Sequence, residues 1–285
     1  MVERYRFILE KCAVYPVQFL CSVMKVSRSG FYDWKRRPKK NQDRLIVDIK
    51  SIHRESRGTY GVPRISIKLK EMGHTAGRHT IHKLMRQENI FGLPIHRKKY
   101  RSPKIAREDL VRQNFIAEHP NQIWCCDITQ KWTTEGWFYL AVVLDLYSRR
   151  VVGWSTGSNM RTELPLRALN QALVLRGNPK GVIHHSDRGS QYTSEQYLKR
   201  QETAELRTSF GSAGTCLDNA VVESFFSVLK RECLNRKSWR TRSELEEAIR
   251  DFIDRFYNPV RIRSNGKTPI QSEREYNQFL AQRCA

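Results

Sequence analysis

The chain has 285 residues, a formal net charge of +22 at pH 7 and an isoelectric point of about 10.0. This length predicts two to three small domains, and the excess of basic residues indicates a polyanionic partner, by default nucleic acid. No stretch predicts a membrane span or a signal peptide. The seven cysteines include no Cys-x-x-Cys pair, which argues against a zinc finger and predicts reduced thiols in a cytoplasmic protein.

The positive charge is concentrated near the N-terminus. Residues 1–110 hold 26 of the 51 Lys and Arg residues but only 10 of the 29 acidic residues. Within this region, residues 1–40 predict a helical N-terminal segment with two short helices, one at 17–24 and one that opens at Ser29. This segment either contacts DNA or is a helical hairpin that packs on the rest of the protein.

Residues 41–95 predict three amphipathic helices, at 43–56, from Pro63 onward, and at 78–87. In the third helix the apolar residues share one face, and the residues expected to point outward are Arg78, His79, Lys83 and Arg86. Three short helices with a basic last helix are typical of a helix–turn–helix DNA-binding domain. A solvated basic face on a structural bundle would give the same pattern.

The segment 118–235 predicts a mixed α/β domain, preceded by a basic linker at 96–117. Apolar and β-branched runs predict strands at 123–129, 137–147, 150–156 and 181–185. The first three should form an antiparallel meander, a helix is expected at 162–175, and a loop is expected at 208–216. The remaining segment, 236–285, predicts a helix at 242–257 and a basic tail that packs back on the core.

Three carboxylates stand out in this domain. Asp127 lies inside the first strand, Asp187 just past the strand at 181–185, and Glu223 on an amphipathic helix for which Asp218 is a suitable N-cap. A carboxylate in an apolar strand is costly unless it is paired or binds a cation. Three carboxylates brought together repel one another, and Mg²⁺, which prefers oxygen ligands, relieves that repulsion. Taken singly, each residue also has a structural or solvated interpretation.

Other titratable residues of the domain are better explained by structure. Asp145 ends the second strand just before a turn, where a hydrogen-bonding role is expected. His184 and His185 precede Asp187 without cysteine partners, so they are weak candidates for metal ligands. The site is therefore expected to consist of the three carboxylates.

Several stretches resemble the DDE catalytic core of retroviral integrases and transposases, and most closely the second-frame transposases of the insertion-sequence-three family. The matching stretches are Pro-Asn-Gln-Ile-Trp at 120–124, His-Ser-Asp-Arg-Gly-Ser-Gln-Tyr at 185–192, and Asp-Asn-Ala-Val-Val-Glu-Ser-Phe-Phe at 218–226. Thirty-five residues separate Asp187 from Glu223. The adjacent pair Cys125 and Cys126 departs from the small or apolar pair expected there, which bears on packing more than on chemistry.

The resemblance implies an α/β fold with a ribonuclease-H-like catalytic core and an all-α helix–turn–helix-like region before it. Asp127, Asp187 and Glu223 would be both catalytic residues and metal ligands for two Mg²⁺ ions, with Mn²⁺ as a substitute. Lys230 matches a basic position near the DNA end, and Arg188, inside the second motif, is a further candidate for DNA binding.

The expected function is metal-dependent DNA strand cleavage and strand transfer at the ends of an insertion sequence. The expected partners are terminal inverted repeats, target DNA, further copies of the chain and an upstream-frame product. Two alternatives stay open: a catalytically silent DNA-binding regulator derived from a transposase, and another nuclease with a ribonuclease-H fold. Retroviral integrase itself is disfavoured, because no cysteine between Cys21 and Cys125 could complete its zinc-binding module.

Overall fold

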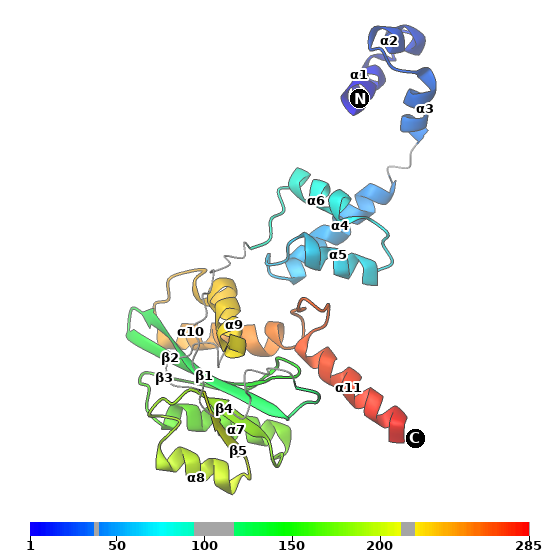
Figure 1. Ribbon diagram of the computed structural model, residues 1–285. Helices are drawn as coiled ribbons and strands as arrows, with labels where there is room; N and C mark the ends of the chain where they lie inside the picture. Colours follow the sequence, from blue (N-terminus) through cyan, green and yellow to red (C-terminus); the bar gives the residue numbers. More distant parts are fainter. Residues whose placement is uncertain (37–39, 94–116, 212–219, 285) are drawn as a thin grey trace.

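The computed structural model describes residues 1–36, 40–93, 117–211 and 220–284. The chain forms, in order, an N-terminal helical unit, a three-helix unit and an α/β core (Figure 1). In this view α10 (Arg242–Arg250) lies below the three-helix unit, and α11 (Pro269–Cys284) starts close to that unit and leads away from it. Within the described residues no helix is both long and apolar enough to cross a membrane.

The N-terminal unit contains three helices where the sequence predicted two. They pack around the fully buried Ile8 and Phe31 and are α1 (Val2–Lys11), α2 (Val17–Val23) and α3 (Arg28–Arg36). The first helix escaped prediction because, from Glu3 to Lys11, only Tyr5 and Ile8 are buried, and charged residues surround them.

The three-helix unit agrees with the sequence prediction. It consists of α4 (Lys40–Glu55), α5 (Val62–Glu71) and α6 (Arg78–Gln87). The buried side chains of α6 are Ile81, Leu84 and Met85, which pack with buried leucine and isoleucine residues of α4 and α5. The same core includes Ile262, which comes from the C-terminal part of the chain and is completely buried.

Polar contacts join the three-helix unit to the α/β core. The Tyr60 hydroxyl accepts a hydrogen bond from the Ile262 amide at 2.7 Å and donates one to the Val260 carbonyl at 3.3 Å. Arg57 forms an ion pair of 2.6 Å with Asp251. The three-helix unit is therefore docked on the core by residues about 200 positions apart in the sequence.

The core is built on a five-stranded sheet of order β3-β2-β1-β4-β5 (Figure 1). Its strands are β1 (Ile123–Thr133), β2 (Gly136–Asp145), β3 (Val151–Gly157), β4 (Ile183–Ser186) and β5 (Arg207–Phe210). The first three form the predicted antiparallel meander, whereas β4 pairs parallel to β1 and β5 parallel to β4. This mixed α/β architecture confirms the predicted fold class.

The strand β5 corrects the prediction of a loop at 208–216, because it occupies Arg207–Phe210. Its sequence, Arg-Thr-Ser-Phe, has no apolar run, and only Ser209 is buried. The strand exists because backbone hydrogen bonding to β4 fixes it. The rest of the predicted loop, from 212, and the proposed cap Asp218 lie outside the described residues.

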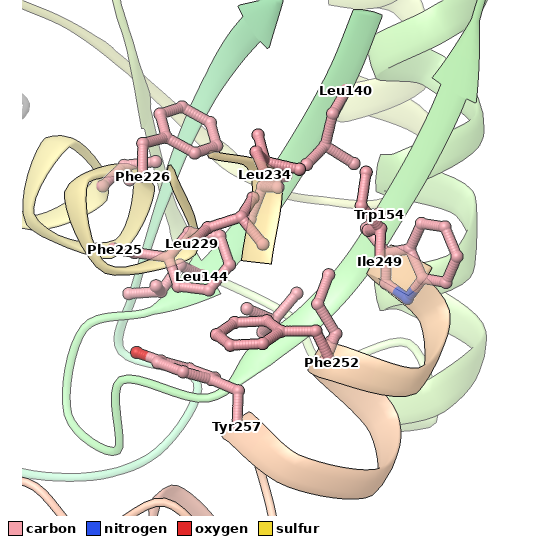
Figure 2. Packing of buried hydrophobic residues seen from close by; sticks show 14 of the residues in the cluster. Leu140, Leu144, Trp154, Phe225, Phe226, Leu229, Leu234, Ile249, Phe252 and Tyr257 are labelled. Atoms are coloured by element: carbon pink, nitrogen blue, oxygen red, sulfur yellow. The ribbon is translucent and has the colours of Figure 1, made fainter. Parts of the chain in front are cut away.

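Helices cover both faces of the sheet. One face packs against α7 (Glu163–Arg176) and α8 (Glu195–Thr203). The other packs against α9 (Ala220–Leu229), the π-helical segment η2 (Lys230–Leu234), α10 (Arg242–Arg250) and the π-helical segment η3 (Asp251–Tyr257). Figure 2 shows Phe225 and Leu229 of α9 among aromatic residues from η3. Two hydrophobic layers therefore hold the sheet in place.

The pair Cys125 and Cys126 belongs to both layers. Successive side chains of a strand point to opposite faces, so the buried Cys125 packs in the layer under α9, and the buried Cys126 in the layer under α7. Burial raises the pKa of Cys126 well above its ordinary value. The two cysteines of this departure thus pack on opposite faces of the sheet.

The C-terminal tail ends in a helix that was not predicted, α11 (Pro269–Cys284). Thr268 and Pro269 begin this helix: the Thr268 hydroxyl accepts from the Gln271 amide at 3.1 Å, and proline suits the first helical position. Glu273 is buried against the core, where it accepts from Ser148 at 2.7 Å and pairs with Arg150 and Arg176. The first turns of the tail do pack on the core.

Candidate active site

Asp127 lies on the face of β1 that is covered by α9. It follows the alternation of Ile123 and Cys125, which pack in the layer under α9, and it is partly buried. One carboxylate oxygen, Oδ1, accepts a hydrogen bond from the Ile128 amide at 2.7 Å. The β1–β4 pairing ends at Cys125 and His185, so two further residues bring the chain to Asp127 on one strand and Asp187 just past the other.

Asp187 begins the loop after β4 and is exposed. Its Oδ1 accepts from the Gly189 amide at 3.1 Å, and a Cβ at position 189 would lie only 3.0 Å from the same oxygen. Arg188 donates from Nε to the Gly211 carbonyl at 3.2 Å. The loop is thus tied to the end of β5, and the Asp187 carboxylate projects into solvent beside the sheet edge.

Glu223 is exposed in the first turn of α9, while Val222 and Phe225 on either side are buried. Lys230, also exposed, begins η2 at the end of the same helix. The hydrophobic layer drawn in Figure 2 fixes this helix against the sheet, so both polar side chains have a rigid support.

The charges of Asp187, Glu223 and Lys230 all act on Asp127. Burial raises the pKa of Asp127 to about 7, and the charges of Asp187 and Glu223 act in the same direction. The hydrogen bond from Ile128 and the charge of Lys230 act in the opposite direction. Burial also raises the pKa of Glu223. A strand, a loop and a helix therefore converge on one group of three carboxylates and a lysine.

The donor chemistry suits a hard divalent cation. Carboxylate oxygens are ligands that Mg²⁺ prefers, and a cation would offset the burial and repulsion that disfavour a charged Asp127. Between Met1 and Cys284, however, no three His, Cys, Asp or Glu side chains of the described residues already stand together as a metal cage. The three carboxylates therefore have suitable chemistry for a metal ion, but their side chains are not arranged as a complete metal site.

The titratable residues for which a structural role was predicted do face into the protein. Asp145 is fully buried and accepts from the backbone amides of Asn121 at 2.7 Å and Ser148 at 3.0 Å. His184 is also fully buried, with Nε2 3.0 Å from the Tyr197 hydroxyl, and burial lowers its pKa to about 3. Both side chains are therefore held by hydrogen bonds inside the protein.

The predicted DNA-binding residues fall into two places. Arg188 and Lys230 lie at the carboxylate site, whereas Arg78, His79, Lys83 and Arg86 are all exposed on α6. Their orientation matches the sequence prediction, and their role in DNA binding stays a prediction.

A third group of polar and aromatic residues was not predicted from the sequence. Trp132 and Trp137 are exposed and face each other across the β1–β2 hairpin, beside Lys131 and Lys237. The sequence did contain one signal for this group, because tryptophan and lysine occur close together both at 131–137 and at 237–239. Their proximity depends on tertiary structure, which no spacing rule supplies.

Both the core and the three-helix unit match known domain families. Integrase core domain models match residues 117–216 and 223–276, and an HTH-like domain model matches residues 40–100. Transposase InsF of insertion sequence IS3A from Escherichia coli (strain K12) is 37% identical over 285 residues, covering 95% of this chain and 98% of the relative. This chain belongs to the IS3 transposase family. The resemblance found in the sequence is confirmed.

Other known proteins resemble this IS3-family chain as well. The uncharacterized 31 kDa protein of insertion element IS600 from Shigella sonnei is 36% identical over 274 residues, covering 92% of this chain and 100% of the relative. The HTLV-2 integrase catalytic core domain, solved in complex with magnesium, aligns with a TM-score of 0.41 and 21% identity, covering 55% of this chain and 98% of that chain. The family assignment rests on the transposase relatives.

Proposed function

We propose that the chain catalyses metal-dependent DNA cleavage and strand transfer at the ends of an insertion sequence. The observation that carries this proposal is the convergence of Asp127, Asp187 and Glu223 around a partly buried carboxylate whose pKa is raised to about 7. Membership of the IS3 transposase family supports the same reaction class. The three carboxylates lie within the two segments that match integrase core models.

The same three carboxylates would hold the metal, as two Mg²⁺ ions with Mn²⁺ as a substitute. Bound metal supplies charge neutralisation at the scissile phosphate and activation of the attacking oxygen. The protein contributes positioning: Asp127 is held by β1 and the Ile128 amide, Asp187 by the Gly189 amide, and Glu223 by the packed helix α9. Preorganised groups of this kind account for most of phosphoryl-transfer catalysis.

Lys230 would bind a DNA phosphate beside the carboxylates. Its ammonium group is exposed, and its charge is felt at Asp127. Such a cation attracts the phosphate backbone and offsets the repulsion between DNA and the three carboxylates. No covalent protein–DNA intermediate is needed, so neither serine nor tyrosine is assigned as a nucleophile.

The basic face of α6 would bind duplex DNA in the terminal inverted repeats. Charge reversal by the paired substitution Arg78→Glu and Lys83→Glu is expected to weaken duplex binding. It should also reduce the slope of log affinity against log salt by roughly 0.9 for each phosphate that the variant no longer neutralises. Fluorescence anisotropy between 50 and 200 mM salt, roughly the range over which ionic binding to phosphates falls steeply, measures both quantities.

A control for this prediction is Lys180→Glu, because Lys180 is exposed before β4, where it pairs with Glu205, and its reversal makes the change of charge of one of the two α6 substitutions. It should alter the salt slope much less than a substitution on α6. Equal slopes for the α6 variant and the wild type would show that this surface does not contact phosphates.

Partners beyond the terminal repeats are proposed on the same basis: target DNA, further copies of the chain on DNA, and the product of an upstream frame as fusion or partner. The deciding experiment is an assay of Mg²⁺- or Mn²⁺-dependent nicking and strand joining on DNA that carries the element's ends. It uses the chain alone and fused to any upstream frame. Joined products support the transposase, whereas DNA binding without cutting in either format favours the regulator. Cleavage of RNA–DNA hybrids would favour the other nuclease.

A further inference from the structure

A groove of about 460 Å³ opens beside the β1–β2 hairpin, at a distance from the carboxylates. One wall is the hairpin itself, and the other is the segment that joins η2 to α10. The lining residues are Lys131, Trp132, Thr133, Thr134, Lys237, Ser238 and Trp239. The Thr134 amide donates to the Trp239 carbonyl at 3.1 Å, so the two walls are joined by hydrogen bonding.

The groove combines aromatic surface with positive charge. Trp132 is 57% exposed. Trp239 is buried, and the Lys237 ammonium lies over its ring at 4.5 Å from the ring centroid. Lys131 donates to Asn235 at 2.8 Å on the opposite wall. Near the rim lie two arginines, Arg240 and Arg242, and two acidic residues, the exposed Glu135 and the half-buried Glu244. Glu244 pairs with Lys237 at 2.6 Å, and Glu135 accepts a hydrogen bond from the Arg242 amide at 2.8 Å. With the two lysines of the lining, cations outnumber carboxylates, so the charge is complementary to a phosphate backbone.

Both walls lead back to the candidate active site. On β1, Asp127 and Lys131 are four residues apart on the same face, which corresponds to about 13 Å along a strand. On the other wall, η2 begins at Lys230, whose charge acts on Asp127, and ends just before Asn235. A strand bound at the carboxylates would therefore reach Lys131 within a few nucleotides. Trp132 points to the opposite face by the same alternation, so the strand would reach its ring around the edge of β1, which β4 covers only from Ile123 to Cys125.

A structural role for the aromatic residues explains only part of this arrangement. Trp132 and Trp137 are direct cross-strand partners with ring centroids 5.1 Å apart at 84°, a geometry that stabilises hairpins. This pairing does not require lysines from two separate segments on either side of Trp132. Exposed aromatic rings beside lysines are instead typical of grooves that bind single-stranded nucleic acid.

We propose that this groove binds an unpaired DNA strand next to the scissile phosphate. One base stacks on Trp132, and Lys131 and Lys237 contact the flanking phosphates. This inference rests on the proposed function, because it takes DNA as the substrate at the carboxylates. It adds a separate subsite, which would hold a strand of the DNA end out of the duplex.

The test uses the full chain and a fluorescently labelled single-stranded oligonucleotide at about 0.2 M salt, where purely ionic binding is weakened. Trp132→Ala is expected to weaken binding by roughly fivefold to a hundredfold, the range found for loss of one base–aromatic stack. Trp132→Phe should restore most of the affinity, because phenylalanine also stacks. In addition, ultraviolet crosslinking of an iodouracil-substituted oligonucleotide should label the peptide that contains Trp132.

The matched control is Trp137→Ala, which removes the other member of the same pair but does not alter the groove lining. It should keep single-strand affinity within about twofold of the wild type, well below the loss of one stacked base. Equal losses in the two alanine variants, or no loss in either, would overturn the proposal, because they indicate a role in hairpin stability alone. A change of oligomeric state in Trp132→Ala with unchanged DNA affinity would overturn it too and assign the surface to a second copy.

Failure of this inference can be separated from failure of the proposed function. Duplex binding and metal-dependent strand cleavage are measured on the same wild-type preparation. If both are present and Trp132→Ala binds single strands normally, only the groove loses its assignment. If cleavage is absent from the wild type, the proposed catalytic function fails instead.

Discussion

Asp187→Asn is expected to abolish DNA cleavage and strand joining while leaving DNA binding intact. Asparagine keeps the size of the side chain and an oxygen that can accept from the Gly189 amide, but it removes one negative charge. A neutral amide is a poorer ligand for a hard cation. If the bond between Asp187 and the metal contributes about 4 kcal/mol to transition-state stabilisation, the rate falls roughly 1,000-fold.

Single-turnover cleavage of end-labelled DNA measures the rate, and fluorescence anisotropy measures binding. Glu195→Gln is the matched control, because this exposed carboxylate starts α8 shortly after the same loop and undergoes the same change of charge. It should cleave at nearly the wild-type rate. A cleavage rate for Asp187→Asn within tenfold of the wild type would remove Asp187 from the proposed catalytic set.

The candidate site is predictable from the sequence because its chemistry is local. Asp127 interrupts an apolar strand, Asp187 follows a strand end, and Glu223 lies on a helix with an apolar stripe, so each can be assigned to an element without tertiary information. The resemblance to transposases supplied the rest: that the three elements converge. Burial is the largest cause of the raised pKa of Asp127, and the charges of Asp187 and Glu223 act in the same direction.

The elements that escaped prediction are those whose stability comes from distant partners. β5 is polar and depends on its pairing with β4. The sequence predicted only a basic tail after residue 257, although Thr268 and Pro269 can begin a helix such as α11. The buried Glu273, which anchors this helix to the core, has partners more than 90 residues away in the sequence.

The docking of the three-helix unit is the clearest example of a long-range feature. Tyr60 and Ile262 are joined by a hydrogen bond although they lie 202 positions apart in the sequence. Neither residue belongs to a recognisable motif, and a buried isoleucine in a basic tail is hard to distinguish from an exposed one. The segment that carries Ile262 is fixed by its neighbour Arg261, whose side chain is buried against Glu232 of η2.

Glu232 makes the most deeply buried ion pair of this junction. Its two oxygens accept from Arg261 at 2.7 and 2.8 Å and from Arg231 at 2.9 Å, and the side chain is only 1% exposed. Burial acts to raise the pKa of Glu232, but the hydrogen bonds and charges of Arg261 and Arg231 outweigh it, so the pKa is lowered. Its contribution to stability is therefore present above the ordinary pKa of a glutamate and is lost as the pH falls through the lowered value.

Glu232→Ala is expected to reduce the free energy of unfolding at pH 7 by about 3–5 kcal/mol, because it leaves the Arg261 charge buried without its main partner. Urea unfolding followed by circular dichroism measures the change. The double variant Glu232→Ala with Arg261→Met should recover much of the loss, since it removes both charges together. Glu71→Ala, which breaks the exposed pair with Lys68, should change the unfolding midpoint little. A Glu232→Ala variant as stable as Glu71→Ala would show that the buried pair does not hold this junction together.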